Sequence, residues 1–164
     1  MEMCVGTLAQ VIDGSYKGPN LPSDVSVLHD ITNGLHYIHT EKLVHRNIKP
    51  ENIMISKNGR MKLSDLSYAD SNNHGSCCWM AQESLEMLLI ARAFGADNSK
   101  NFKLKVTPSC DIFSAGCVFF VFLTRAIGGI HPFGNEFIEQ LCNVRKGDPV
   151  NIESKFIIVY CIFS

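Results

Sequence analysis

Apolar residues recur at helical spacing between Asp24 and Thr40. Their intervals place them on one face of an α-helix: Val27, Leu28, Ile31, Leu35 and Ile38. Ser23 or Asp24 can supply the side-chain oxygen that caps a first helical turn. The pattern therefore predicts an amphipathic helix over residues 24–40.

The second half of the chain contains the longest apolar run, from Cys110 to Leu123. It is too long for a typical strand, and Thr107-Pro108-Ser109 before it is a helix-entry signal, so we expect a buried helix that Gly128-Gly129 breaks. A short helix is expected from about Trp79 to Ala93. The polar spans 68–78 and 94–107 indicate loops.

The pattern over residues 135–146 predicts one more amphipathic helix, which Gly147-Asp148-Pro149 ends. Its expected inward positions are Phe137, Ile138, Leu141 and Val144.

Two short strands are expected between the first helix and the polar span. Ile53–Ile55 is apolar, Met61–Ser64 alternates, and Lys57-Asn58-Gly59-Arg60 joins them. Asn-Gly between such runs is a strong hairpin signal. The predicted fold is therefore mainly α with a small β-hairpin.

The composition limits the number of domains, the partners and the kinds of site that the chain can have. The chain has 164 residues, 46% hydrophobic and 19% charged, which fits one globular domain. The net charge of -1 gives no electrostatic case for nucleic acid or a membrane surface. The seven cysteines include no C-x-x-C pair, so buried reduced thiols are expected rather than a zinc site. The longest terminal apolar run, residues 156–163, is well short of the roughly 20 residues of a spanning helix, so no membrane segment is expected.

The segment His45–Asn52 carries the candidate chemistry. It reads H-R-N-I-K-P-E-N, and the catalytic loop of protein kinases reads H-R-D-x-x-x-x-N. Asn47 stands where that signature has its catalytic Asp. Asp65-Leu66-Ser67 stands where the kinases have D-F-G, and Ala81-Gln82-Glu83 where they have A-P-E. In order and content these motifs resemble the large lobe of a eukaryotic protein kinase.

A narrower resemblance is to the kinase part of the inositol-requiring kinase/endoribonucleases of the unfolded-protein response. The runs 111–119 and 131–134 look like that family's central helix and the following turn. Residues 2–4 with Thr7-Leu8 look like its hinge and next helix. The resemblance implies a kinase-like C-terminal lobe (α+β family) over residues 1–150, from the hinge to about the seventh family helix, with the N-terminal lobe missing. Residues 151–164 are then an apolar tail outside the family. The implied location is cytoplasmic, in a full-length relative on the cytosolic side of the endoplasmic reticulum.

The resemblance also implies roles for individual residues. Asn52 and Asp65 would hold Mg²⁺ through oxygen atoms, which suit this cation. Lys49 would neutralise charge on the transferred phosphoryl group of ATP. The hinge residues Glu2 and Cys4 are expected to contact the nucleotide together with those three. Asn47 keeps the shape of the catalytic Asp but cannot take a proton, and a general base is worth about 10²–10⁴-fold in rate.

The same residues also have structural interpretations. His45 is expected to pack beneath the loop, and Asp111 to hold the loop backbone through hydrogen bonds. Arg46 is expected either to meet an activation-segment phosphate or to pair with a nearby carboxylate. The histidines of residues 24–40 are interpreted as scattered surface residues rather than metal ligands: His29, His36 and His39.

Three functions stay open at this point. One is a serine/threonine kinase-like domain with impaired phosphoryl transfer, and the second is a non-catalytic pseudokinase interaction module. The third is a truncated fragment of an unfolded-protein-response sensor kinase, because no G-x-G-x-x-G occurs in the sequence. Expected partners are a protein substrate or a kinase-like dimer partner. Self-association through the apolar residues 156–163 is a further expectation.

Overall fold

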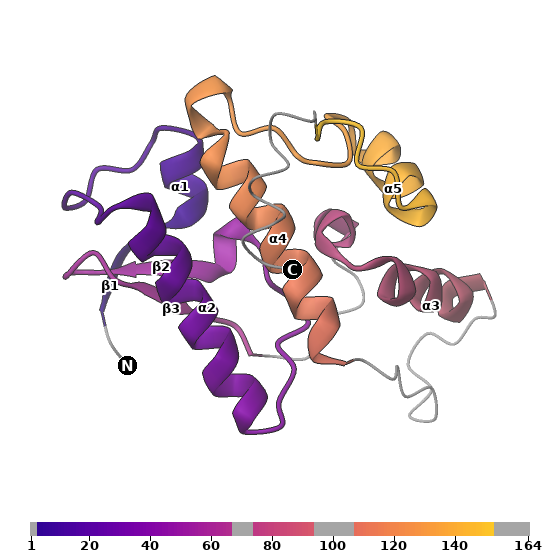
Figure 1. Ribbon diagram of the computed structural model, residues 1–164, viewed down its shortest axis with the longest axis horizontal. Helices are drawn as coiled ribbons and strands as arrows, with labels where there is room; N and C mark the ends of the chain where they lie inside the picture. Colours follow the sequence, from indigo (N-terminus) through magenta and orange to yellow (C-terminus); the bar gives the residue numbers. More distant parts are fainter. Residues whose placement is uncertain (1–2, 67–73, 94–106, 153–164) are drawn as a thin grey trace.

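The computed structural model describes residues 3–66, 74–93 and 107–152 (Figure 1). These ranges contain three strands and five helices, in the order β1 (Cys4–Thr7), α1 (Leu8–Ile12), α2 (Asp24–Thr40), β2 (Ile53–Ser56), β3 (Met61–Leu63), α3 (Gln82–Ala93), α4 (Pro108–Leu123) and α5 (Phe137–Lys146). Three short 3-10 turns lie at Pro50–Asn52, His74–Trp79 and Arg125–Ile127. The predicted fold class and element order are confirmed.

The strands form one antiparallel sheet in the order β1-β2-β3. The expected hairpin joins β2 to β3, and Gly59 occupies the left-handed region at φ 74° within its turn. The Gly59 N–H donates to the Ser56 carbonyl over 2.9 Å, which closes the turn. β1 is an addition to the prediction, because its four residues carry no alternation that would mark a strand.

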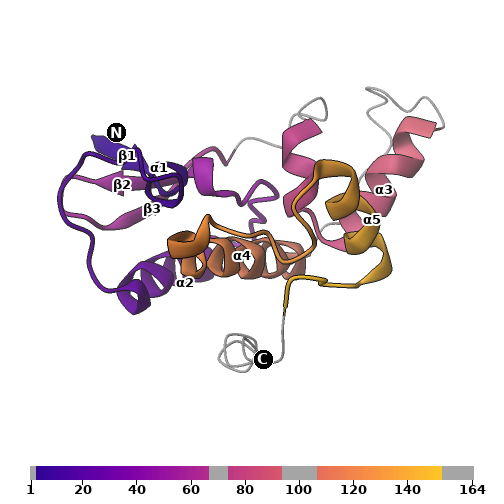
Figure 2. The same cartoon turned by 90° about the horizontal axis from the view of Figure 1, so that it is seen from above.

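Helix α2 packs against β3, and α4 lies beside α2 and also contacts α1 (Figure 2). Ser23 caps α2, since its Oγ accepts from the Ser26 N–H. The predicted apolar face of α2 is buried except for a partly covered Leu28. α4 begins after Thr107, as expected, but it already ends at Leu123, so Gly128-Gly129 follows a separate 3-10 turn instead of breaking the helix.

The core has two parts, and α4 contributes to both. The larger cluster joins the sheet to α1, α2 and α4 and includes Leu8, Ile31, Ile55, Val118 and Phe122. The smaller cluster joins α4 to α3 and α5 through Cys117, Leu85 and Val144. α4 therefore fixes the position of the loop between α2 and β2 relative to both halves (Figure 1).

The predicted inward face of α5 is only half right. Val144 is buried and Leu141 is partly buried, but Phe137 is 42% and Ile138 72% exposed. These two residues form the first turn of the helix, which the other described residues leave uncovered. The helix ends as predicted at Gly147, whose φ of 66° suits glycine.

The apolar residues 156–163 lie outside the described residues, and the self-association expected of them stays a prediction. Just before them, the Asn151 N–H donates to the Pro132 carbonyl over 3.0 Å. Within the described ranges, the helices are all too short or too polar to cross a membrane.

Candidate active site

A buried carboxylate, Asp111 in the first turn of α4, holds the loop that follows α2. Its Oδ2 accepts from the His45 N–H and its Oδ1 from the Arg46 N–H, each over 2.8 Å. The His39 Nε2 lies 2.8 Å from the same Oδ2. Asp111 is only 1% exposed, so these partners replace water around its charge. The structure thus shows the hydrogen-bond role expected for Asp111.

His39 corrects the interpretation of the α2 histidines as scattered surface residues. It is a partly buried partner of Asp111, whereas His29 and His36 are exposed. Within residues 3–66, 74–93 and 107–152, no three His, Cys, Asp or Glu side chains gather as a metal site.

The imidazole of His45 ties the loop to the end of β3. Its Nε2 lies 3.0 Å from the Ser64 carbonyl, and its Nδ1 accepts from the Asn47 N–H over 3.3 Å. Burial lowers the pKa of His45, although the Asp111 charge opposes that effect. The ring is therefore neutral at pH 7, and the Nε2–H tautomer satisfies both partners. His45 is structural, as expected from the sequence.

Two residues of the site adopt left-handed backbone conformations without being glycine. Arg46 has φ 68° and Asp65 has φ 61°. Such residues cost about 1 kcal/mol or more and persist where their surroundings hold them, often at functional sites. For Arg46 the restraint is the hydrogen bond of its N–H to Asp111.

Three predicted site residues meet beside the 3-10 turn Pro50–Asn52. The Asn52 Nδ2 donates to the Asn47 carbonyl over 2.8 Å, and the Asn47 Nδ2 donates to Asp65 Oδ2 over 3.1 Å. Asn52 is buried, and its carbonyl accepts from the Ser64 N–H over 2.9 Å. Lys49 is half-buried at the start of the turn, where its carbonyl accepts from the Asn52 N–H.

The Asn47–Asp65 contact depends on Asn47 being an amide. An aspartate at this position would place two carboxylates together, which disfavours the charged form of each. The amide instead donates a hydrogen bond to the carboxylate. Asn47 is therefore compatible with the folded loop, while it lacks an atom that could accept a proton.

The oxygen atoms of this group fit a hard divalent cation. Because Asn52 uses its Nδ2 for the Asn47 carbonyl, its Oδ1 is the atom left for a ligand. Asp65 supplies a carboxylate from the residues directly after β3. Carboxylate and amide oxygens are the ligands that Mg²⁺ takes in proteins.

The expected nucleotide contacts are spread along β2. Cys4 of β1 lies opposite Ser56 at the turn end of β2, whereas Asn52 directly precedes the other end. Four strand residues span about 13 Å. Glu2, the other expected hinge contact, lies outside the described residues. Glu83, the last residue of the motif at the place of A-P-E, is exposed in the first turn of α3.

Sequence reasoning missed two contributors to the site, His39 and Ser64. The His39–Asp111 contact joins residues 72 positions apart, so no local period reveals it. Ser64 acts through backbone and hydroxyl groups that bond to Asn52 and His45. The hairpin prediction placed Ser64 at the end of the second strand but did not indicate these bonds.

Comparisons with known proteins agree on one family. The family model described as protein kinase domain matches residues 1–152. Human serine/threonine-protein kinase/endoribonuclease IRE2 is 31% identical over 91% of this chain and 16% of its own length. IRE1 of Hypocrea jecorina is 30% identical over 90% of this chain and 15% of its own. Serine/threonine-protein kinase stk11 of Xenopus laevis is 31% identical over 90% of this chain and 33% of its own length.

A solved structure supports the same assignment. The MAP kinase LMAMPK10 of Leishmania major superposes with a TM-score of 0.57 at 26% identity. The match covers 87% of this chain and 39% of that chain. This chain thus spans a third or less of the three curated relatives and well under half of the solved kinase.

Proposed function

This chain belongs to the protein kinase family, and from that premise we propose that it forms the large-lobe side of a serine/threonine kinase site with impaired phosphoryl transfer. The observation that supports impairment is the hydrogen bond from Asn47 Nδ2 to Asp65 Oδ2. In this bond Asn47, which stands at the place of the catalytic base, is the donor. Its amide has no basic atom that could replace the carboxylate of an aspartate.

Within this proposal, Asn52 and Asp65 hold Mg²⁺ beside the phosphates of ATP. The metal neutralises charge on the phosphate oxygens when it is bound. Lys49 adds a positive charge at the same end of β2. The packing of Asn52 among Asn47, Lys49 and Ser64 keeps its side chain oriented before any ligand arrives.

The nucleotide would lie along β2, with its base toward Glu2 and Cys4 and its phosphates toward Asn52. The spacing supports this direction, because β2 separates Cys4 from Asn52 by one strand length. Cys4 is half-buried and pairs with Ser56 in the sheet, which fixes its position at that end of β2.

Asn47 would lower transfer without removing the binding residues. A positioned general base contributes about 10²–10⁴-fold, so the loss should fall in that range when everything else is in place. The acceptors would be serine or threonine hydroxyl groups of proteins, by analogy with the serine/threonine-protein kinases among the relatives.

A second candidate function is a non-catalytic interaction module. The same Asn47–Asp65 bond favours it, since it stabilises the loop without ligand. For such a module, the family resemblance implies a role in the unfolded-protein response on the cytosolic side of the endoplasmic reticulum, with a kinase-like partner in a dimer.

The test is a labelling assay with ATP, Mg²⁺ and a serine/threonine-containing peptide. The wild-type chain should incorporate no more label than Lys49→Ala, because the base is absent. Clear incorporation that Lys49→Ala abolishes would contradict the proposed impairment.

Metal and nucleotide binding is tested separately by thermal unfolding with and without ATP–Mg²⁺. Any stabilisation should disappear in Asp65→Ala and persist in Asp148→Ala, whose side chain is exposed after α5. If Asp65→Ala is stabilised as much as Asp148→Ala, Asp65 does not hold the metal.

A further inference from the structure

One side of α4 is apolar and incompletely covered. Three residues spaced four positions apart share this side, and they are termed the outer stripe: Ile112, Gly116 and Phe120. Ile112 is 52% exposed and Gly116 is exposed. Phe120 is buried, but it belongs to neither of the two core clusters. The outer stripe therefore lies on the side of α4 that faces neither cluster.

No described helix or strand covers this side of α4. In Figure 2 the described helices and strands lie above or beside α4, and none lies directly below it. Beyond the backbone of its own helix, a Cβ added at Gly116 would have no described residue within 4 Å. Asp111 is the only charged residue of α4, and a helix that is apolar nearly all round is normally buried on every side. The outer stripe thus lacks part of the cover that such a helix needs.

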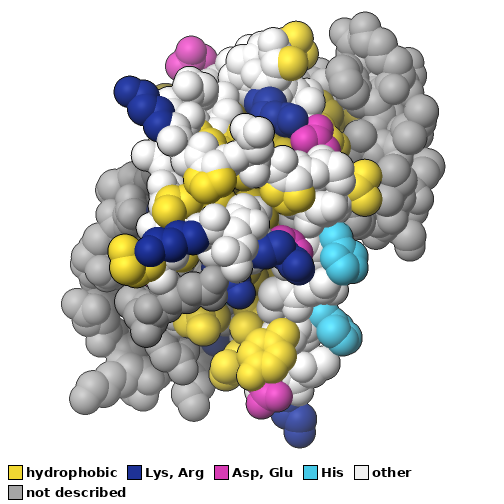
Figure 3. Space-filling view, turned by 90° about the vertical axis from the view of Figure 1, so that its left-hand side faces the viewer, with side chains coloured by type: hydrophobic (Ala, Val, Ile, Leu, Met, Phe, Trp, Pro, Cys, Tyr) yellow, Lys and Arg dark blue, Asp and Glu magenta, His cyan; other side chains and the backbone are white. Residues whose placement is uncertain are grey.

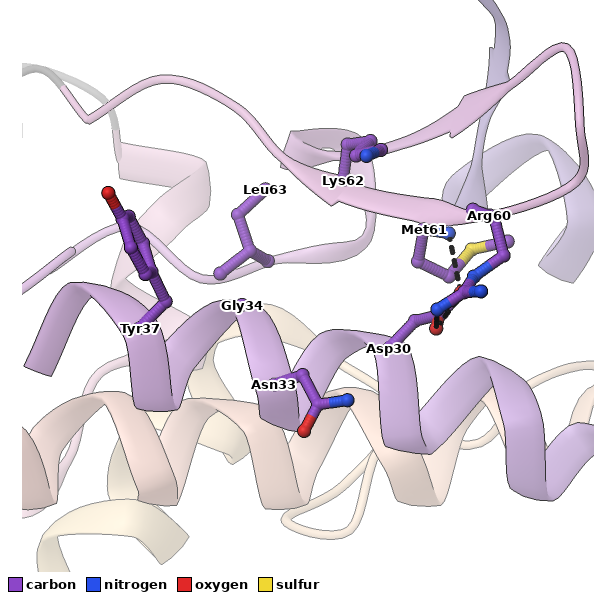
Figure 4. Close-up of a pocket in the computed structure, with 8 residues that line it drawn as sticks. All are labelled: Asp30, Asn33, Gly34, Tyr37, Arg60, Met61, Lys62 and Leu63. Atoms are coloured by element: carbon purple, nitrogen blue, oxygen red, sulfur yellow. Dashed lines mark hydrogen bonds and ion pairs between the residues drawn. The ribbon is translucent and has the colours of Figure 1, made fainter.

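Two other surfaces do not share these properties. In the space between α2 and β3, Leu63 fills the space above Gly34 (Figure 4). Asp30 pairs with Arg60 in the same space. On the face drawn in Figure 3, charged side chains interrupt the hydrophobic surface. The outer stripe contains no charged residue, so a segment without charge is its complement.

The described part of the chain ends close to the outer stripe. The Asn151 N–H donates to the Pro132 carbonyl over 3.0 Å. The next residue, Phe133, packs on Phe113 of α4 with the ring centroids 5.5 Å apart. Phe113 directly follows Ile112 in the helix. These contacts fix the end of the described chain beside the first half of α4.

Residues 156–163 match the outer stripe in chemistry and in length. They read F-I-I-V-Y-C-I-F and contain no charge. Three residues separate them from Ile152, so Phe156 lies within about 14 Å of that residue. The outer stripe covers eight residues of helix rise, about 12 Å. Eight extended residues span about 26 Å, which is enough to cover it.

The short connection favours binding within one chain over binding to a second copy. A segment tethered by a short linker has an effective concentration of about millimolar at a site that it can reach. At micromolar concentrations of the chain, a second copy competes poorly for the same surface. Binding within one chain therefore competes with the self-association that the sequence predicts for residues 156–163.

We propose that residues 156–163 bind the outer stripe of α4 in the same chain. Their apolar side chains cover Ile112, occupy the space over Gly116 and contact Phe120. Removal of this apolar surface from water drives the binding. Asp111 belongs to the same helix and holds the loop that carries Asn47, so the bound segment also stabilises the support of the candidate active site.

Limited chymotrypsin cleavage after Tyr160 of the full chain tests the binding, because a protease cleaves a bound segment only when it is released. The wild type should be cleaved there at least about tenfold more slowly than a synthetic peptide of residues 153–164. Equal cleavage rates in the chain and in the peptide would overturn the proposal.

Variants locate the binding surface. Ile112→Glu and Gly116→Glu each place a charge on the outer stripe and should raise the rate of cleavage after Tyr160 at least about fivefold. The matched control is Val25→Glu, on α2 at 76% exposure, which should be cleaved at the wild-type rate. Cleavage after Phe122, which is fully buried, should stay equally slow in all four chains and so excludes unfolding as the cause. Wild-type rates after Tyr160 in both stripe variants would refute the site.

Sedimentation at about 1 and 50 µM separates binding within one chain from binding to a second copy. The wild type should be monomeric at both concentrations and equally resistant to cleavage after Tyr160. If the resistance appears only at the concentration at which the chain dimerises, a second copy supplies the surface and the proposal is wrong.

Discussion

Removal of the Asp111 carboxylate should destabilise the chain strongly. In Asp111→Ala, three nitrogen donors and the weak thiol donor of Cys110 lose their acceptor; the nitrogen donors are the N–H groups of His45 and Arg46 and the His39 Nε2. A buried donor left without a partner costs about 1–3 kcal/mol. Two backbone donors, with a smaller contribution from the partly exposed His39, give a loss of about 3–5 kcal/mol. That is a large part of the roughly 5–15 kcal/mol by which domains are usually stable.

The strain at Arg46 adds to the effect. Its φ of 68° is held by the bond of its N–H to Asp111, so the loop is free to relax once that bond is gone. Relaxation would recover some stability but would move Asn47, the next residue. We therefore expect Asp111→Ala to disturb the candidate site as well as the free energy of unfolding.

Urea unfolding followed by fluorescence measures the loss. Trp79 is the only tryptophan, and its carbonyl accepts from Ser114 Oγ on α4, so its emission reports on packing around that helix. The control is Asp24→Ala, which breaks a partly exposed 2.7 Å ion pair with Arg125 and should cost at most about 1 kcal/mol. If Asp111→Ala costs no more than Asp24→Ala, water satisfies the loop donors and the reasoning fails.

Other predictions follow from single residues. Gly147→Ala should lower the free energy of unfolding by about 1 kcal/mol because of its φ of 66°, whereas Gly116→Ala, in an open position on α4, should raise it; urea unfolding compares the two. Burial raises the pKa of Asp30, but hydrogen bonds from Arg60 and the Met61 N–H outweigh it and leave the pKa lowered. Its stabilisation is thus present above the unfolded pKa and lost as the pH falls through about 4 and below, so Asp30→Asn should flatten that part of a stability–pH curve. Burial lowers the pKa of His131 to about 4, so the unfolded chain binds more protons than the folded chain between about pH 6.5 and 4. The free energy of unfolding should therefore decrease as the pH is lowered through that range, and an equally steep decrease in His131→Asn would contradict this.

Local signals in the sequence were sufficient for the elements that position the site. The helix over 24–40 has both an apolar stripe and a capping serine, and the hairpin has Asn-Gly between two apolar runs. Such signals depend only on residues close together in the sequence, and the structure contains the helix and the hairpin that they predict. They failed where burial depends on distant partners, as for Phe137 and Ile138, whose exposure is set by what covers the first turn of α5.

The site itself was predicted from motif resemblance, and its contacts were not. Asn47, Asn52 and Asp65 were expected together, and the structure brings them together through two amide donors. That Asn47 would donate to Asp65 could not be read from the sequence, because it depends on the loop geometry that Asp111 fixes from 65 residues away. The ion pair between Asp30 of α2 and Arg60 of the hairpin escaped prediction for the same reason, since the two residues meet only in three dimensions.

Because of the Asn47–Asp65 contact, we expect Asn47→Asp to lower the stability of the chain while it restores a candidate base for phosphoryl transfer. Asn47→Asp restores the residue type of a kinase base but replaces a 3.1 Å hydrogen bond by two carboxylates. Loss of the bond costs about 0.5–1.5 kcal/mol, and like charges near about 4 Å in a water-like medium add about 1 kcal/mol. The variant should therefore melt several degrees lower than the wild type without metal. Mg²⁺ held by Asp65 would screen the repulsion, so the gap between the two melting temperatures should narrow in its presence. An Asn47→Asp variant that melts at or above the wild type without Mg²⁺ would show that this contact does not stabilise the loop.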